Sequence, residues 1–214
     1  ILMIKEIKVK KRNGRLEQIN LDKINECAER ACEGLDNVSV SEIVLDASIQ
    51  LYNKISTAEI DKALIMSARS KIEKEPNYNY VAARMLLNNL YKEVFKESIC
   101  SQTLRLQYKA SFIKNIKLMV KRDRLSPKLL DYDLEFLADA LHPERDGLFK
   151  YLGIQTLYDR YFVHIEGRRV ETPQSFWMRA AMGLCLDEEN KEEAVLEIYN
   201  LSLIHISEPT RQAE

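Results

Sequence analysis

Several polar residues near the N-terminus have the types and spacing needed to hold a polyphosphate. A triphosphate carries several negative charges and needs several donors held together, since one exposed cation contributes little against water and salt. The guanidinium fork of arginine suits phosphate oxygens, and a helix N-terminus adds backbone N–H groups. The residues concerned are Lys10, Lys11, Arg12, Glu17, Asn20 and Lys23.

The elements that would position these residues are a hairpin and a helix. Apolar and polar residues alternate on both sides of Asn13-Gly14. Asn-Gly between two such runs predicts a type I′ hairpin turn, which needs positive φ at both central positions. A helix is predicted to open at residues 21–23. Two interpretations stay open from the residues alone: a nucleotide site, or a solvated basic surface on which Glu17 merely pairs across the strands with Lys10 or Arg12.

Four helices are predicted after the hairpin, because apolar residues recur at helical spacing. Capping residues and Pro76 mark their limits. The helices are expected to begin near Leu21, after Ser39 or Ser41, at Ser56 or Thr57, and near Tyr80. One hairpin and four helices make a unit of about a hundred residues, which is a common domain size.

A second helical region is predicted beyond a boundary at residues 97–101. Helices are expected over 104–120, 134–141, 152–158 and 193–199, with a small hairpin around Glu166-Gly167. Thr172-Pro173 predicts a helix start, with threonine as N-cap and proline at the first helical position. In this last helix Trp177 is expected in the core. Arg179 is expected to pair with Glu171 or Asp187, since an unpaired buried charge is costly.

Composition limits the possible function classes. The chain has 214 residues and a net charge of −1 from 32 basic and 33 acidic residues. This balance argues against a general nucleic-acid-binding role. No apolar run reaches membrane-helix length, and the N-terminus lacks a signal-peptide layout, so a cytoplasmic location is expected and no membrane partner. The four cysteines and three histidines show no metal-ligand spacing, so no metal site is expected.

Four longer segments occur in an order and spacing that resemble a known family. They read IKVKKRNGRLEQINLDKI, ISTAEIDKALI, YNYVAARMLLNNLYKEVF and ETPQSFWMRAAMGL. Together they resemble the N-terminal part of the large subunit of class I (aerobic) ribonucleotide reductases over residues 5–200. The resemblance implies a mainly α fold. An ATP-cone, a small β-hairpin cap with a four-helix bundle, would occupy residues 5–97. The helical N-terminal region of the reductase's α/β barrel domain would occupy residues 102–200.

The C-terminal residues depart from this resemblance. Residues 201–214 read LSLIHISEPTRQAE, which matches nothing expected of the family. A non-native tail is predicted there, and a genuine divergent terminus is the alternative.

Matching the family pattern position by position implies a nucleotide site. Its residues would be Val9, Lys11, Arg12, Glu17, Asn20, Lys23, Thr57, Asp61 and Lys92. In that pattern the four cations hold phosphates, while Glu17 and Asn20 reach the base or sugar region or support the magnesium and phosphate geometry. Thr57 and Asp61 would face the base or ribose. In the family pattern, position 61 is histidine in some relatives and aspartate in others.

The resemblance also implies an activity, effectors and partners. The intact enzyme would convert ribonucleoside diphosphates to deoxyribonucleoside diphosphates for DNA synthesis. ATP would activate it and dATP inhibit it through the cone, with Mg²⁺ accompanying the nucleotide. The radical metallocofactor would reside in the small (beta) subunit. Further partners would be other copies of the full-length chain, as a homodimer or higher oligomer, and thioredoxin or glutaredoxin.

The family's catalytic cysteines lie downstream of residue 200. No catalytic residue is therefore assigned, and this chain alone is not expected to reduce ribonucleotides. Two other functions remain as alternatives. The first is a stand-alone ATP-cone sensor without reductase activity. It is disfavoured because no Cys₄ ribbon precedes the cone and because Thr172–Leu184 would have no role. The second is a helical interaction protein whose basic hairpin is only surface. A nucleotide titration separates the second from the others.

Overall fold

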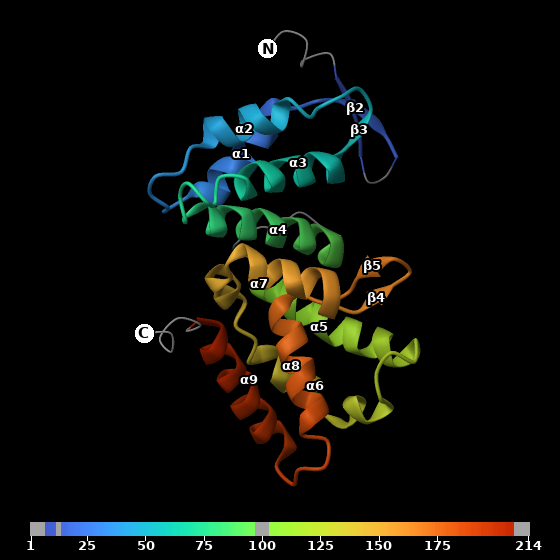
Figure 1. Cartoon of the computed structure of the whole chain (residues 1–214). Coiled ribbons are helices and arrows are strands. Elements are labelled where there is room, and N and C mark those ends of the chain that lie inside the picture. The colour runs from blue at the N-terminus through green and yellow to red at the C-terminus, as the bar shows by residue number, and fades with distance from the viewer. Residues whose placement is uncertain (1–6, 12–13, 97–102, 208–214) are drawn as a thin grey trace. The chain divides into compact units, whose positions relative to one another are not determined.

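The mainly helical fold predicted from the sequence is confirmed. The computed structural model describes residues 7–11, 14–96 and 103–207 (Figure 1). Two compact units divide the chain: the first comprises residues 1–89 with 150–155, and the second comprises residues 90–149 with 156–214. Within the described residues no helix is long and apolar enough to cross a membrane.

The first unit contains a three-stranded sheet at its N-terminal end (Figure 1). Its strands are β1 (Lys8–Lys10), β2 (Leu16–Gln18) and β3 (Ile55–Ser56), in the order β2-β1-β3. The antiparallel pair β1–β2 confirms the predicted hairpin, with Val9 opposite Glu17. Strand β3 was not predicted. It pairs parallel to β1, with Val9 opposite Ile55, and two residues are too few to show a strand period.

The connection between β1 and β2 differs from the predicted two-residue turn. The Lys11 N–H donates to the Arg15 carbonyl at 2.8 Å, and the Gly14 N–H donates to the Lys11 carbonyl at 2.9 Å. Lys11 and Arg15 therefore pair at the base of the loop, which the predicted two-residue turn does not allow. Gly14 has a φ of +83°, a left-handed conformation that glycine adopts without steric cost. Arg12 and Asn13 lie outside the described residues.

Four helices complete the first unit, and each of the first three has a side-chain cap. They are α1 (Leu21–Cys32), α2 (Val40–Ser48), α3 (Thr57–Arg69) and α4 (Tyr78–Phe95). The predicted caps Ser39 and Ser56 are confirmed for α2 and α3. Fully or nearly fully buried apolar side chains from the sheet and all four helices form the core, among them Val9, Ala28, Ile43, Ile55, Leu64, Ala68 and Val81.

The second unit consists mostly of short helices around α5 and α8. Its elements are α5 (Leu104–Lys121), η2 (Pro127–Asp131), α6 (Leu134–Asp139), η3 (Pro143–Leu148), η4 (Leu157–Tyr161), β4 (His164–Ile165), β5 (Arg168–Arg169), α8 (Pro173–Leu184) and α9 (Lys191–Ser207). Helix α7 (Tyr151–Thr156) precedes η4 and groups almost entirely with the first unit. The predicted β4–β5 hairpin is confirmed, and Glu166 and Gly167 at its turn both have positive φ.

The start of α8 follows the sequence prediction in position but not in detail. Thr172 stands at the N-cap and Pro173 at the first helical position, yet the threonine makes no capping hydrogen bond. Its hydroxyl pairs instead with the Ser175 hydroxyl at 2.8 Å. Arg179 pairs with Glu171, which is 1% exposed. Trp177 is only half-buried, so the predicted core position of this side chain is confirmed only in part.

Candidate functional site

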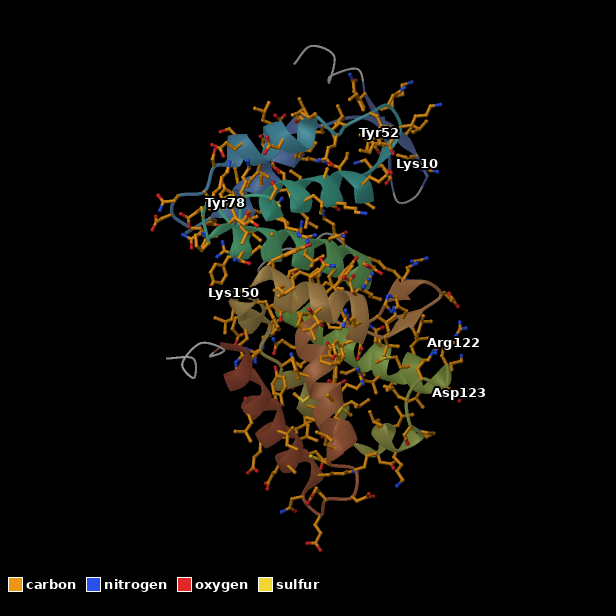
Figure 2. All side chains as sticks on the ribbon, viewed as in Figure 1. Lys10, Tyr52, Tyr78, Arg122, Asp123 and Lys150 are labelled. Atoms are coloured by element: carbon orange, nitrogen blue, oxygen red, sulfur yellow. The ribbon has the colours of Figure 1, made fainter. Side chains whose placement is uncertain are left out.

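The sheet of the first unit places two helix N-termini at opposite ends of β1. Helix α3 starts directly after β3, and the parallel pairing sets Ser56 beside Lys10. Strand β2 runs antiparallel, so α1, which starts at Leu21, begins at the Lys8 end. Three residues of strand span only about 10 Å. Both helix starts therefore lie close to one short cationic strand, and Lys10 and Tyr52 mark the sheet end of this unit in Figure 2.

Lys11 forms an ion pair across the hairpin. Its Nζ lies 3.3 Å from Glu17 Oε2, with side chains that are 31% and 54% exposed. A cross-strand partner for Glu17 was one of the two open interpretations; the partner observed is Lys11, and Arg12 lies outside the described residues. Exposed ion pairs contribute only about 0–1 kcal/mol. The phosphate of a ligand can therefore compete with Glu17 for the Lys11 ammonium.

Asn20 caps helix α1, a role that the sequence analysis missed. Its Oδ1 accepts a hydrogen bond from the Lys23 N–H at 3.0 Å. The signal was present, since asparagine is among the best N-cap residues and Asp22 follows it in the first turn. The Lys23 side chain is exposed at the same helix start. The cap therefore fixes the backbone from which Lys23 projects.

The start of α3 is closed by a capping box. The Ser56 hydroxyl accepts from the Glu59 N–H at 3.2 Å, and Glu59 Oε2 accepts from the Ser56 N–H at 2.9 Å and from the Ser56 hydroxyl at 2.7 Å. The Tyr52 hydroxyl also donates to Glu59, at 2.6 Å. The hydrogen bonds from Tyr52 and Ser56 lower the pKa of Glu59 to about 2. A fixed negative charge therefore occupies this helix N-terminus.

Seven of the nine predicted site residues lie on or next to strands β1 and β2 and at the starts of α1 and α3. They are Val9, Lys11, Glu17, Asn20, Lys23, Thr57 and Asp61. Val9 is 4% exposed, so its side chain belongs to the core. Thr57 and Asp61 are half-buried, one turn apart on α3. Arg12 lies outside the described residues, and Lys92 belongs to the part of α4 that groups with the second unit.

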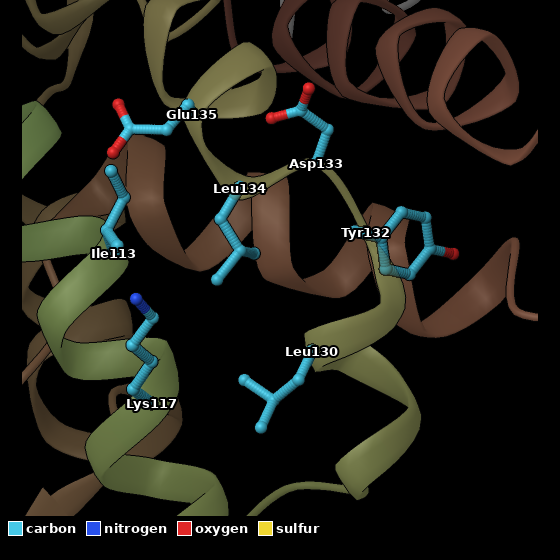
Figure 3. A pocket seen from close by; sticks show the side chains of 7 residues that line it. All are labelled: Ile113, Lys117, Leu130, Tyr132, Asp133, Leu134 and Glu135. Carbon is cyan, nitrogen blue, oxygen red and sulfur yellow. The ribbon is translucent and has the colours of Figure 1, made fainter.

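The second unit contains a hollow that does not suit a polyphosphate. It has a volume of about 360 Å³ and lies among residues of α5, η2 and α6 (Figure 3). Its polar lining groups are Lys117, Tyr132, Asp133 and Glu135, together with apolar side chains. Asp133 already caps α6 through the Phe136 N–H, and Glu135 pairs with Lys109 at 3.1 Å. One cation against two carboxylates disfavours an anionic ligand here.

Comparison with known proteins matches two segments of the chain to known domains. Residues 7–93 match the ATP cone domain, and residues 147–205 match the ribonucleotide reductase all-alpha domain. The class of protein is thus an ATP cone domain followed by the all-alpha domain of a ribonucleotide reductase.

Relatives name the family more closely. The chain is 43% identical over 176 residues to the ribonucleoside-diphosphate reductase subunit alpha of Chlamydia muridarum, covering 80% of this chain and 16% of that protein. It is 36% identical over 198 residues to the subunit of Helicobacter pylori, covering 91% and 24%. For Haemophilus influenzae the identity is 32% over 218 residues, covering 97% and 28%. The chain belongs to the family of ribonucleoside-diphosphate reductase alpha subunits and spans 16–28% of the length of these relatives.

Proposed function

We propose that this chain is the effector-binding N-terminal part of a class I ribonucleoside-diphosphate reductase large subunit, with ATP and dATP as its ligands. The observation that carries the proposal is the cationic hairpin between two helix starts, in a segment that matches the ATP cone domain. The division into a cone over residues 5–97 and a helical reductase region over 102–200 is part of the same proposal.

The phosphates would lie on the hairpin side of the site. Lys11, Arg12, Lys23 and Lys92 are the proposed phosphate-binding residues. Lys11 supports this side, because it directly follows β1 and its side chain is 31% exposed. The weak, exposed Lys11–Glu17 pair supports it too, since its exchange for a phosphate contact costs little.

The base and ribose would lie on the α3 side. Thr57 and Asp61, half-buried and one turn apart, are the proposed contacts, and neither adds a cation that a phosphate would need. Glu17 and Asn20 would reach the sugar or support magnesium, for which carboxylate and amide oxygens are suitable ligands. Val9 would line the site from the central strand.

The intact enzyme would reduce ribonucleoside diphosphates, with ATP activating and dATP inhibiting. Two nucleotides that differ by one 2′-hydroxyl can shift an assembly only through their different affinities for its states. We propose a small subunit carrying the radical metallocofactor, self-association of the full-length chain, and thioredoxin or glutaredoxin as reductant. A cytoplasmic location accompanies this set of partners.

Calorimetric titration of the 214-residue chain with ATP and with dATP, in the presence of Mg²⁺, tests the proposal. We expect each nucleotide to bind and each to displace the other from one site. CTP should bind more weakly, because Thr57 and Asp61 are assigned to the base side. An absence of heat for both adenine nucleotides, while circular dichroism shows the helical fold, would contradict the proposal.

A further inference from the structure

Asp146 is a buried carboxylate that the nucleotide site does not use. It lies in η3 and is 1% exposed. One carboxylate oxygen, Oδ2, accepts hydrogen bonds from the hydroxyls of Tyr91 and Tyr108. The other, Oδ1, accepts from Gln174 Nε2 at 2.8 Å. These three donors come from the end of α4, from α5 and from α8, so a single side chain joins the last part of α4 to two helices of the second unit.

The hydrogen-bond network continues through Gln174 to α9. The Tyr199 hydroxyl donates to Gln174 Oε1 at 2.7 Å and accepts from the His142 N–H at 3.1 Å. Buried polar networks of this kind stabilise a single arrangement, because every unmade hydrogen bond would leave a polar group buried without a partner. The network therefore holds the helices that it joins in one arrangement.

The last turn of α4 has a second attachment in the same unit. Glu93 accepts from the Arg169 N–H at 2.7 Å and pairs with its guanidinium at 3.4 Å, and these side chains are only 17% and 16% exposed. The rings of Tyr91 and Phe95 stack at 5.5 Å and meet the Tyr108 ring edge-on. Two polar contacts and an aromatic cluster thus attach this turn to the second unit.

The first part of the same helix is attached to the first unit. The Tyr78 hydroxyl accepts from the Ser39 N–H at 3.0 Å. Arg84 Nη1 donates to the carbonyls of Ala31 and Glu33, at 3.1 and 2.7 Å, at the end of α1. Helix α4 is continuous from Tyr78 to Phe95. A single helix therefore carries polar attachments in the unit with the nucleotide site and in the unit with Asp146.

We propose that the Tyr91–Asp146 hydrogen bond is the connection through which nucleotide binding in the ATP cone domain alters the all-alpha domain. The inference rests on the proposed function. Tyr91 is a positioning residue in this account, since it touches no nucleotide and acts by holding the last turn of α4. A nucleotide that orders α1 and α3 also orders α4, and the network passes that ordering to α5 and α8.

Hydrogen–deuterium exchange of the 214-residue chain, with and without dATP and Mg²⁺, tests the inference. In the wild type we expect dATP to slow exchange in α1 and α3, and also in α5 and α8, by about fivefold or more. Tyr91→Phe should keep dATP binding and the slowing in α1 and α3, but lose the slowing in α5 and α8. Tyr108→Phe is the matched control, because it removes a hydroxyl from the same Asp146 oxygen but from α5. It should keep the effect on α8.

The other possible outcomes would contradict either the proposed function or this inference. No dATP binding in the wild type refutes both the proposed function and this inference. Binding with slowed exchange only in the first unit refutes the inference alone, as does an equal effect of Tyr91→Phe and Tyr108→Phe on α8. If Tyr91→Phe fails to fold, Glu93→Gln weakens the other attachment of the same turn. Because Glu93→Gln leaves the Tyr91–Asp146 hydrogen bond in place, the dATP effect on α5 and α8 should persist in this variant, and its loss would contradict the inference.

Discussion

Lys11 illustrates how one residue can have a structural partner and remain a ligand candidate. In its pair with Glu17 the Lys11 side chain is partly exposed and the Glu17 side chain is exposed, which limits the contribution of the pair to stability. A triphosphate offers more charge than one carboxylate and can form several charge-assisted hydrogen bonds with the same ammonium. The ion pair therefore positions Lys11 before binding without preventing a phosphate contact.

Replacing both hairpin cations tests their assignment to phosphate. Lys11→Ala with Arg12→Ala should weaken ATP and dATP alike, by about tenfold or more, because hydrogen bonds to charged groups contribute about 1.5–3 kcal/mol each. Calorimetric titration measures both affinities. Lys74→Ala is the control, since it removes an exposed lysine of the same unit outside the proposed set. Loss of one nucleotide only would show that these two cations do not hold phosphates.

The raised pKa of the Asp146 carboxyl predicts that the free energy of unfolding depends on pH. Burial raises its pKa from 3.8 to about 6, although hydrogen bonds from Tyr108, Tyr91 and Gln174 oppose the rise. The folded state thus holds this proton where the unfolded chain has lost it. The free energy of unfolding should therefore fall as pH rises through this range, by about 3 kcal/mol in total from this group.

Urea unfolding of the wild type and of Asp146→Asn, at about pH 5 and about pH 7, measures this effect. The stability of the wild type relative to the variant should fall by about 1 kcal/mol between these two conditions. The carboxylates shared by both proteins cancel in the comparison. An unchanged difference would mean that Asp146 titrates at its ordinary value.

At the scale of elements, the start of α1 combines a cap and a candidate ligand contact in Asn20. The side-chain oxygen is used by the Lys23 N–H, so a loss of nucleotide affinity in Asn20→Ala could come from either role. Aspartate accepts the same capping hydrogen bond as asparagine but adds a negative charge and removes the amide donors. Comparison of the two variants therefore separates the roles.

Asn20→Ala should lower the free energy of unfolding by about 1 kcal/mol, the usual cost of a lost N-cap. Asn20→Asp should keep that stability and weaken dATP binding, because aspartate lacks the amide donors with which Asn20 would reach the sugar. Thermal unfolding and titration of both variants measure the two effects. Full affinity in Asn20→Asp would assign Asn20 to capping alone.

At the scale of the whole molecule, helix α4 belongs partly to each of the two units. Residues 78–89 group with the first unit and residues 90–95 with the second, and the ATP cone match ends at residue 93, inside the last turn. A helix transmits displacement and ordering along its length, since its backbone hydrogen bonds are consecutive. The end of the ATP cone domain is therefore also a structural part of the second unit.

The sequence by itself determined the local structure of this protein. Apolar spacing predicted most helices, Ser39 and Ser56 marked two caps, and Pro173 marked a helix start, because these signals depend on residues a few positions apart. The family motifs likewise predicted a cone followed by a helical reductase region. For the proposed nucleotide site, the sequence predicted the residues but not the groups that they contact in the folded chain.

Only the tertiary structure decided which distant residues meet. The pairing of β3 with β1 joins residues 9 and 55, and no local pattern carries that register. The burial of Asp146 depends on tyrosines 55 and 38 residues before it, so its isolated position in the sequence resembles that of any surface aspartate. Burial and pairing arise from packing between distant segments, and their energies appear only once the chain has folded.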